Sequence, residues 1–265
     1  MKHNVLGVLV DETTYADATQ RIITAAHDGR GYAVSALAVH GVMTGVQDDA
    51  HRLRLNSMDL ITPDGQPVRW ALRLLHGVRL PDRVYGPTLT LHVLREAERS
   101  GLPVYFYGSK PEVLERLVAK LRRQYPDLEI AGAEPSLFRT ISVDEKQEIA
   151  TRIRASGAKI LFAGLGCPRQ EVFAYEFKDV VSMPILAVGA AFDYHAGLVS
   201  EPPSWVQRAG LQWLYRLVQQ PTRLWRRYLL LNPHYLILLF LQFFGLWRAK
   251  ILPNAQDSPD EGIAA

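Results

Sequence analysis

The sequence predicts an α/β protein whose core is a Rossmann-like, mostly parallel sheet with helices on both faces. Two observations carry this prediction. Short β-branched runs alternate with amphipathic helical stretches, and the strand-like runs end before about residue 195. The 265 residues are 48% apolar, enough for one sizeable core and an appendage. We therefore expect an α/β core over residues 1–197, a basic and apolar helical appendage over residues 198–253, and a disordered tail over residues 254–265.

Each predicted strand is a short run of β-branched or aromatic residues bounded by turn-forming residues. In chain order the strands are Val5–Val10, Ala33–Ala38, Leu60–Thr62, Val104–Tyr107, Leu128–Ala131, Ile160–Ala163 and Ile185–Val188. Helical periodicity fills most of the gaps between them. The predicted helices are Tyr15–His27, Val68–Leu75, Thr88–Arg99, Glu112–Gln124, Val143–Ala155 and Gln170–Phe177. In such folds ligands bind at the carboxyl ends of the strands, so the residues that follow each strand are the first candidates for a site.

The composition and the start of the chain restrict the class of protein. The apolar run Val5–Val10 is too short for a signal peptide, so we expect a cytoplasmic start. The single cysteine, Cys167, excludes an internal disulfide and fits a reducing compartment. The net charge is only +3, but arginines crowd the segment from Arg208 to Arg248. Such a region suits nucleic acid, acidic lipid headgroups or a phosphate-bearing substrate, and composition does not choose among these.

The last apolar stretch, residues 229–247, approaches the length of a membrane span. It is interrupted by Asn232, Pro233, His234 and Gln242. These interruptions favour a helix that lies in the plane of a membrane surface or inserts shallowly. The alternative is a helix in the core or in an oligomer interface, and the sequence leaves a homo-oligomer open.

Asp64 follows the third predicted strand, in the turn Thr62-Pro63-Asp64-Gly65. Gly65 permits a tight turn, and Pro67 suits the first turn of the next helix. A carboxylate in this place is a candidate catalytic base. The alternative is that Asp64 only caps the N-terminus of the following helix.

A glycine-rich turn, Gly164-Leu165-Gly166-Cys167-Pro168, follows the predicted strand Ile160–Ala163 and precedes a helix. Free backbone N–H groups and the positive end of the helix dipole form a natural phosphate seat there. The spacing is neither the complete dinucleotide-binding fingerprint nor a Walker loop. Gln170 and Glu171 follow in the helix. The amide of Gln170 suits a sugar hydroxyl, or the side chain simply faces solvent.

Small residues also follow two other predicted strands, Gly108 and Ser109 after one and Gly189 after the other. Three such turns at three strand ends predict one shared nucleotide crevice, although each turn alone is also ordinary loop chemistry. Asp193 lies shortly beyond Gly189 and is assigned to the same crevice.

His195 and Cys167 carry the side chains of an acid–base group and a nucleophile, but the sequence favours structural roles for both. Cys167 has only Arg169 near it in sequence to activate the thiol, so packing in the turn is favoured. For His195, loop packing or binding of a hydroxyl is favoured over proton transfer. No Asp-x-Asp or His/Asp cluster has metal-ligand spacing, so we expect neither a metal nor another cofactor.

Five segments together carry a resemblance to a known family. They are Thr62-Pro63-Asp64-Gly65, Arg83-Val84-Tyr85-Gly86, Gly164-Leu165-Gly166-Cys167-Pro168-Arg169-Gln170-Glu171, Val188-Gly189-Ala190-Ala191-Phe192-Asp193 and Gly210-Leu211-Gln212-Trp213-Leu214-Tyr215-Arg216-Leu217. From about Val5 to Tyr228 the chain resembles the WecB/TagA/CpsF family, glycosyltransferase family 26. The resemblance implies an inverting, metal-independent hexosyltransferase that uses a UDP-sugar, of N-acetylmannosamine type or related. The implied acceptor is an undecaprenyl-diphosphate-linked saccharide, in the assembly of exopolysaccharide, teichoic acid or common antigen.

The resemblance also implies residue roles. Asp64 falls on the family's base, Arg83 and Gln170 on its substrate-contacting residues, and Arg216, Arg223 and Arg226 on arginines that meet the acceptor diphosphate. Inverting transfer needs one base behind the nucleophile and positive charge or N–H donors on the leaving diphosphate, which agrees with this set. The UDP-sugar then occupies the crevice formed by Gly108, Ser109, Gly164, Gly166, Gln170, Glu171, Gly189 and Asp193.

The implied partners are the UDP-sugar donor, the polyprenyl-diphosphate acceptor and a membrane surface, without nucleic acid. Arginines beside an apolar run suit lipid phosphate, and Trp and Tyr side chains suit the membrane–water boundary. The implied location is therefore the cytoplasmic face of the cell membrane, as a peripheral protein.

One segment departs from the family pattern. Ser35-Ala36-Leu37-Ala38-Val39-His40-Gly41 stands where many members carry Thr-x-Asn, and Ala36 and Ala38 lack hydrogen-bonding side chains. The family's sugar specificity is therefore not transferred, and His40 is either a replacement contact or a structural residue. Two alternative functions remain. One is a nucleotide-sugar epimerase or dehydrogenase, disfavoured by the incomplete Rossmann fingerprint, and the other is a non-catalytic membrane-associated scaffold.

Overall fold

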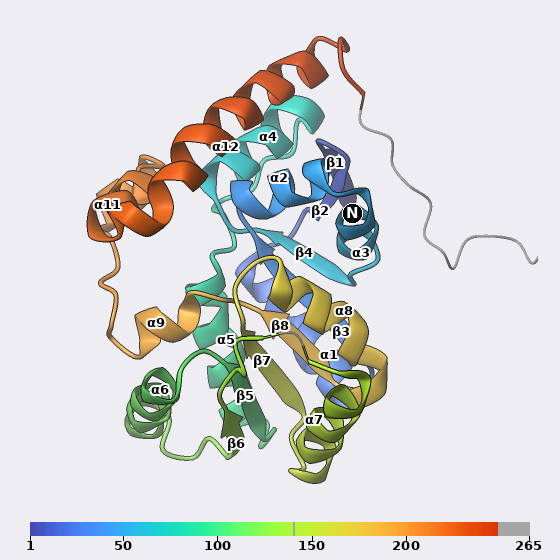
Figure 1. Ribbon diagram of the computed structural model, residues 1–265, viewed down its shortest axis with the longest axis vertical. Helices are drawn as coiled ribbons and strands as arrows, with labels where there is room; N and C mark the ends of the chain where they lie inside the picture. The colour runs from blue at the N-terminus through green and yellow to red at the C-terminus, as the bar shows by residue number, and fades with distance from the viewer. Residues whose placement is uncertain (140, 249–265) are drawn as a thin grey trace, which may run out of the picture.

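The computed structural model describes residues 1–139 and 141–248, and within them the chain forms a six-stranded parallel sheet with helices on both faces (Figure 1). The strand order is β4-β3-β8-β7-β5-β6. The strands are β3 (Tyr32–Leu37), β4 (Leu60–Pro63), β5 (Val104–Gly108), β6 (Ile130–Glu134), β7 (Ile160–Gly164) and β8 (Pro184–Ala187). The predicted fold class is confirmed.

Side chains of each strand alternate between two apolar cores, one on each face of the sheet. In β5, Val104 and Phe106 pack in one core, whereas Tyr105 and Tyr107 pack in the other. The first core includes α1 (Tyr15–His27), α5 (Gly86–Arg99) and α6 (Pro111–Gln124). The second includes α2 (Val39–Gln47), α3 (Asp49–Asn56), α4 (Gln66–His76), α7 (Val143–Ala155) and α8 (Arg169–Val181). Because both faces are covered, the two innermost strands, β8 and β7, consist of apolar residues and glycine only.

The prediction of one strand over Val5–Val10 is wrong. The segment belongs to an antiparallel hairpin, β1 (Lys2–Val5) and β2 (Val8–Asp11), which is separate from the parallel sheet. Leu6 and Gly7 form its two-residue turn with φ values of 54° and 87°. Such turns need positive φ at both positions, and the side chain of Asn4 supports this one by accepting a hydrogen bond from Gly7 N–H. The continuous apolar pattern concealed the turn.

The other predicted elements are confirmed within a few residues, and α1 and α7 have the predicted bounds. A capping box fixes the start of α7, where Ser142 Oγ accepts from Glu145 N–H and the Glu145 carboxylate accepts from Ser142 N–H. The strand predicted at Leu128–Ala131 is shifted to β6. Three helices are absent from the sequence-based prediction: α2, α3 and α9 (Ala191–His195).

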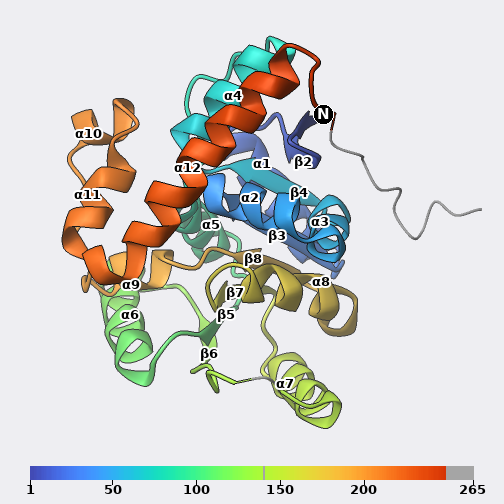
Figure 2. The same cartoon turned by 45° about the horizontal axis from the view of Figure 1, so that its top comes forward.

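Helices alone follow β8 in the described part of the chain: α9 is followed by α10 (Ser204–Arg208), α11 (Gln212–Gln219) and α12 (Pro221–Phe243). Helix α12 packs on α2 and α4 (Figure 2). Tyr235 is buried there and donates its hydroxyl hydrogen to Pro67 O at 3.2 Å. Further along, the Gln242 side chain accepts from Leu6 N–H at 2.9 Å and donates to Asn4 O at 3.2 Å. The last helix therefore returns to the N-terminal hairpin.

Helix α12 has two different sides. Leu224, Tyr235, Leu238 and Leu239 are buried against the protein. The other side, which we call the exposed apolar face of α12, consists of Leu229, Leu230, Leu236, Ile237, Phe240, Phe243 and Phe244. Among the described residues, no helix combines the length and apolar character that a membrane crossing requires. The tail predicted to be disordered, residues 254–265, lies outside the described residues.

Candidate functional site

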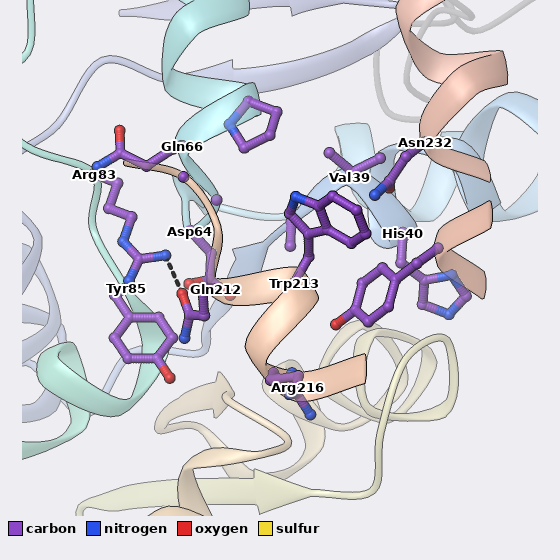
Figure 3. A pocket seen from close by; sticks show the side chains of 15 residues that line it. Val39, His40, Asp64, Gln66, Arg83, Tyr85, Gln212, Trp213, Arg216 and Asn232 are labelled. Carbon is purple, nitrogen blue, oxygen red and sulfur yellow. Dashed lines mark hydrogen bonds between the residues drawn. The ribbon is translucent and has the colours of Figure 1, made fainter. Parts of the chain in front are cut away.

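Two cavities meet at the carboxyl end of the sheet. Among the described residues, four line both of them: Ala38, Asp64, Tyr85 and Arg216. The glycine-rich cavity extends from this junction over the ends of β3, β5, β7 and β8. The aromatic cavity extends in the other direction, toward α11 and α12 (Figure 3). The site therefore consists of two compartments with one carboxylate and one guanidinium between them.

The glycine-rich cavity depends on residues without side chains. Gly166 has a φ of 76° and open space where a Cβ would stand, so its backbone faces the cavity. At Gly189 a Cβ would stand 2.8 Å from Gln170 Oε1, and at Gly164 it would stand 2.5 Å from Phe192 Cδ2. Gly108 differs from the sequence-based expectation: it is packed against the Gly164 backbone, and is not among the described residues that line the cavity. Its neighbour Ser109 does line it.

Two helices begin at the wall of this cavity. The N-terminal residues of α8, Arg169 and Gln170, line it, as does Lys110, the N-cap residue of α6. Unpaired N–H groups and the helix dipole make such ends favourable for phosphate. Two cationic side chains add to this effect. The cavity can therefore hold a diphosphate.

Gln170 and Glu171 are buried, so the solvent-facing alternative for Gln170 is wrong. Gln170 Nε2 donates to Glu171 Oε1 at 2.9 Å, and Ser35 Oγ donates to the same oxygen at 3.1 Å. Burial raises the pKa of the Glu171 carboxyl group above its usual range. The pair thus forms a rigid polar wall in which Glu171 orients the amide of Gln170.

Asp64 is half-buried at the end of β4. The helix-cap alternative for α4 is not what the structure shows, because the N-cap of α4 is Gly65 and receives no side-chain cap. Instead, Asp64 Oδ1 accepts from the N–H of Gly86, the first residue of α5, at 3.3 Å. The hydrogen bond orients the carboxylate at the junction, and a carboxylate there is placed to accept a proton.

The aromatic cavity is lined by side chains from distant parts of the chain, as Figure 3 shows. Val39 and His40 come from α2, Trp213 from α11, and Tyr228 and Asn232 from α12. His40 is therefore placed at this cavity. A cavity that combines aromatic rings with several polar side chains suits a saccharide ligand.

Arg83 also lines the aromatic cavity, but most of its hydrogen bonds hold the appendage. Its guanidinium is buried and donates to Gln212 Oε1 and, at 2.9 Å, to Gln207 Oε1. It also stacks on the ring of Tyr85, 4.3 Å from the centroid. Arg83 thus connects α10 and α11 to the core, and the dashed line in Figure 3 marks its bond to Gln212.

The three predicted arginines separate in the structure. Arg216 lines both cavities and lies 5.8 Å from the ring centroid of Tyr194. Arg226 is exposed on α12 beside Trp225. It is not one of the described residues that line the two cavities. The side chain of Arg223 lies outside the described part of the structure.

Two other sequence candidates have different surroundings. Cys167 is half-buried and lines the glycine-rich cavity, as does Asp193. His195 Nε2–H donates a hydrogen bond to Pro87 O at 2.9 Å, and burial lowers the pKa of the imidazole. It is not among the described residues that line the two cavities, which supports the packing role.

Several lining residues received no individual role from the sequence. Tyr85 and Tyr194 are buried beside the junction, and burial raises the pKa of each hydroxyl. Gln212 and Trp213 lie in the last family-like segment, and Tyr85 lies in the second. The family-like segments were therefore the sequence signal that could have identified Tyr85, Gln212 and Trp213. For Tyr194 the only such signal was its place beyond the last strand.

Comparisons with known proteins show which family the sequence matches. The model of the Glycosyl transferase WecG/TagA/CpsF family matches residues 3–249. A similar protein from Bacillus spizizenii (strain ATCC 23059 / NRRL B-14472 / W23) is 31% identical over 220 residues, which cover 82% of this chain and 79% of the relative. That relative is N-acetylglucosaminyldiphosphoundecaprenol N-acetyl-beta-D-mannosaminyltransferase.

Proposed function

Because the chain belongs to the WecG/TagA/CpsF family of glycosyl transferases, we propose that it moves a sugar from a UDP-sugar to an undecaprenyl-diphosphate-linked saccharide in cell-surface polysaccharide assembly. The observation that carries this proposal is the position of Asp64 where two cavities of different character meet. One cavity suits a nucleotide diphosphate and the other suits the acceptor. Family membership also argues against the epimerase, dehydrogenase and scaffold alternatives.

The proposed reaction is a single inverting displacement. The acceptor hydroxyl oxygen attacks the anomeric carbon, the bond from that carbon to the diphosphate breaks, and Asp64 takes the hydroxyl proton. UDP leaves with the bonding electrons into the glycine-rich cavity. There the N-termini of α6 and α8, with Lys110 and Arg169, stabilise the charge that develops. This scheme needs no metal ion.

The donor sugar lies, in this proposal, against the wall made by Gln170 and Glu171. The oriented amide of Gln170 offers a hydrogen bond to a sugar hydroxyl. Ala36 and Ala38 line the same cavity. Neither offers a polar side chain, so recognition of the donor, an N-acetylmannosamine-type sugar or a related hexose in this proposal, does not depend on side-chain hydrogen bonds from these two positions.

The acceptor enters through the aromatic cavity, in which Trp213 and Tyr228 provide stacking surfaces for its saccharide. Arg216 is then close to the acceptor diphosphate and to the reacting centre. The exposed apolar face of α12 begins directly beyond Tyr228. That face would rest on the cytoplasmic side of the cell membrane, as a peripheral contact, and bring the cavity to a lipid-anchored substrate.

The proposal is tested with the purified full-length protein, a panel of UDP- and GDP-sugars and a synthetic polyprenyl-diphosphate saccharide. We expect selective thermal stabilisation by UDP and by one or a few UDP-sugars, because a ligand that binds the folded state raises its stability. We also expect UDP release that requires both donor and acceptor. Binding of liposomes without stabilisation by any nucleotide would contradict the proposal and support the scaffold.

A further inference from the structure

Three side chains of metal-ligating type meet beside the glycine-rich cavity. His51 lies in α3, Cys167 in the turn after β7, and Glu171 in α8. Their ligand atoms all lie within 4.8 Å of one another. Cys167 and Glu171 also line the cavity, so the cluster is connected to it. The sequence hides this group, because His51 is far along the chain from the other two.

Two members of the cluster are buried with polar atoms that the protein does not satisfy. His51 is 2% exposed and Glu171 is 1% exposed. Within the described residues, no hydrogen-bond partner is found for either ring nitrogen of His51 or for Glu171 Oε2. A buried polar group that is left without a hydrogen-bond partner destabilises the folded state. A ligand that used these atoms would remove that destabilisation.

We propose that His51, Cys167 and Glu171 bind one thiophilic divalent cation of the Zn²⁺ class. A thiolate, an imidazole and a carboxylate are three donors of the kind found in tetrahedral zinc sites, and the cavity leaves space for a fourth ligand such as water. Magnesium and calcium prefer several oxygen ligands, whereas this cluster offers one carboxylate. The proposal is independent of the transfer reaction, which uses no metal in the scheme above.

The surroundings of the cluster suit this role. Ligands on one zinc ion lie roughly 3–4 Å apart, so the cluster needs to contract by about 1 Å. Glu171 Oε1 is already held by Ser35 and Gln170, which leaves Oε2 for the metal. Hydrogen bonds to a liganding carboxylate are the usual means of orienting it. Binding would therefore stiffen Glu171 and, through it, Gln170 at the cavity wall.

The direct test is titration of chelator-treated, reduced full-length protein with Co²⁺ and then Zn²⁺. We expect one equivalent of Co²⁺ to produce a thiolate-to-cobalt charge-transfer band with the visible bands of a tetrahedral site, and Zn²⁺ to displace it. Isothermal titration and the thermal unfolding midpoint then give the Zn²⁺ affinity. Absence of the charge-transfer band in the wild-type protein would overturn the proposal.

Substitutions distinguish Zn²⁺ binding at the cluster from adventitious binding elsewhere on the protein. Cys167→Ser should abolish the charge-transfer band and weaken Zn²⁺ binding at least ~100-fold, and His51→Leu should weaken it at least ~10-fold. The matched control is His27→Leu, which removes an exposed histidine at the end of α1 and should leave both readouts unchanged. If His51→Leu fails to fold, Cys167→Ser decides alone, since this thiol lies at the cavity wall. Unchanged Zn²⁺ affinity in Cys167→Ser would refute the site.

Discussion

The two cavities on either side of Asp64 are built in different ways. The glycine-rich cavity lies at the ends of parallel strands, with glycines where side chains would collide or where φ is positive. The aromatic cavity is formed by side chains of α2, α11 and α12, which meet only after the last helix has packed on the core. The first compartment is thus set by local sequence and sheet topology, and the second by long-range packing. From this difference we can predict which substitutions should weaken binding of the donor and which should weaken use of the acceptor.

Substitution of Arg216 should give the largest difference between the effect on acceptor transfer and the effect on UDP affinity. Arg216→Ala should lower transfer to the lipid-linked acceptor at least ~100-fold, because the guanidinium that lies close to the acceptor diphosphate and to the reacting centre is lost. UDP affinity should change less than ~10-fold, since Lys110, Arg169 and the two helix N-termini remain. Steady-state kinetics with varied acceptor, together with UDP titration, measure the two effects.

The matched control for Arg216→Ala is Arg226→Ala, which removes an exposed arginine of α12. With a short-chain acceptor in solution it should retain wild-type activity. Equal losses of transfer activity in the two variants would show that the arginines contribute only general positive charge. Such a result would contradict the specific role of Arg216 in the acceptor compartment.

A smaller effect is expected at the backbone of the donor compartment. Gly166 has a φ of 76° and open space at the Cβ position, and Gly157, after α7, has a φ of 79° and equally open space. Alanine at either position should therefore reduce the free energy of unfolding by a similar amount, about 1–2 kcal/mol. Gly166→Ala should in addition weaken UDP binding ~10-fold or more, because its backbone faces the cavity.

Calorimetric UDP titration and chemical denaturation of the two glycine variants provide the comparison. The Gly157→Ala protein should bind UDP as the wild type does. If both variants bind UDP normally, the glycine-rich cavity is not where the diphosphate resides.

The smallest of these effects concerns the exposed apolar face of α12. Leu236→Asn removes a leucine that is 59% exposed, and should weaken binding to vesicles containing anionic lipid about fivefold, as expected for partial insertion of one leucine. Activity with a water-soluble acceptor should stay unchanged. Vesicle co-sedimentation measures the affinity, and an unaltered vesicle affinity would argue that this face contacts something other than a membrane.

The same contrast explains what sequence reasoning found. Asp64, Gln170, Gly164, Gly166 and Gly189 follow predicted strands, and parallel strand ends converge at one edge of a sheet, so these residues could be assigned to a shared crevice. Ser109, Glu171 and Asp193 were placed there by the same argument. Gly108 was assigned too, yet its role is to let β5 approach the backbone of β7.

The aromatic cavity could not be assembled in the same way. It requires α2, a helix whose sequence includes two glycines and three β-branched valines and therefore gave no clear helical signal. It also requires α12 to return to the hairpin, which depends on Tyr235 and Gln242 finding partners far away in sequence. Arg216 and Arg226 looked alike as basic residues near an apolar run, and only packing distinguishes the cavity arginine from the exposed one.

The central claim is that Asp64 is the base at the junction of the two cavities. The most direct measurement is single-turnover transfer by Asp64→Asn, with UDP affinity and unfolding measured on the same preparation. The account predicts a loss of about 10²- to 10⁴-fold in the transfer rate, with UDP affinity and stability close to those of the wild type, because the amide keeps the shape but cannot take the proton. An Asp64→Asn protein that transfers sugar at the wild-type rate would contradict the account.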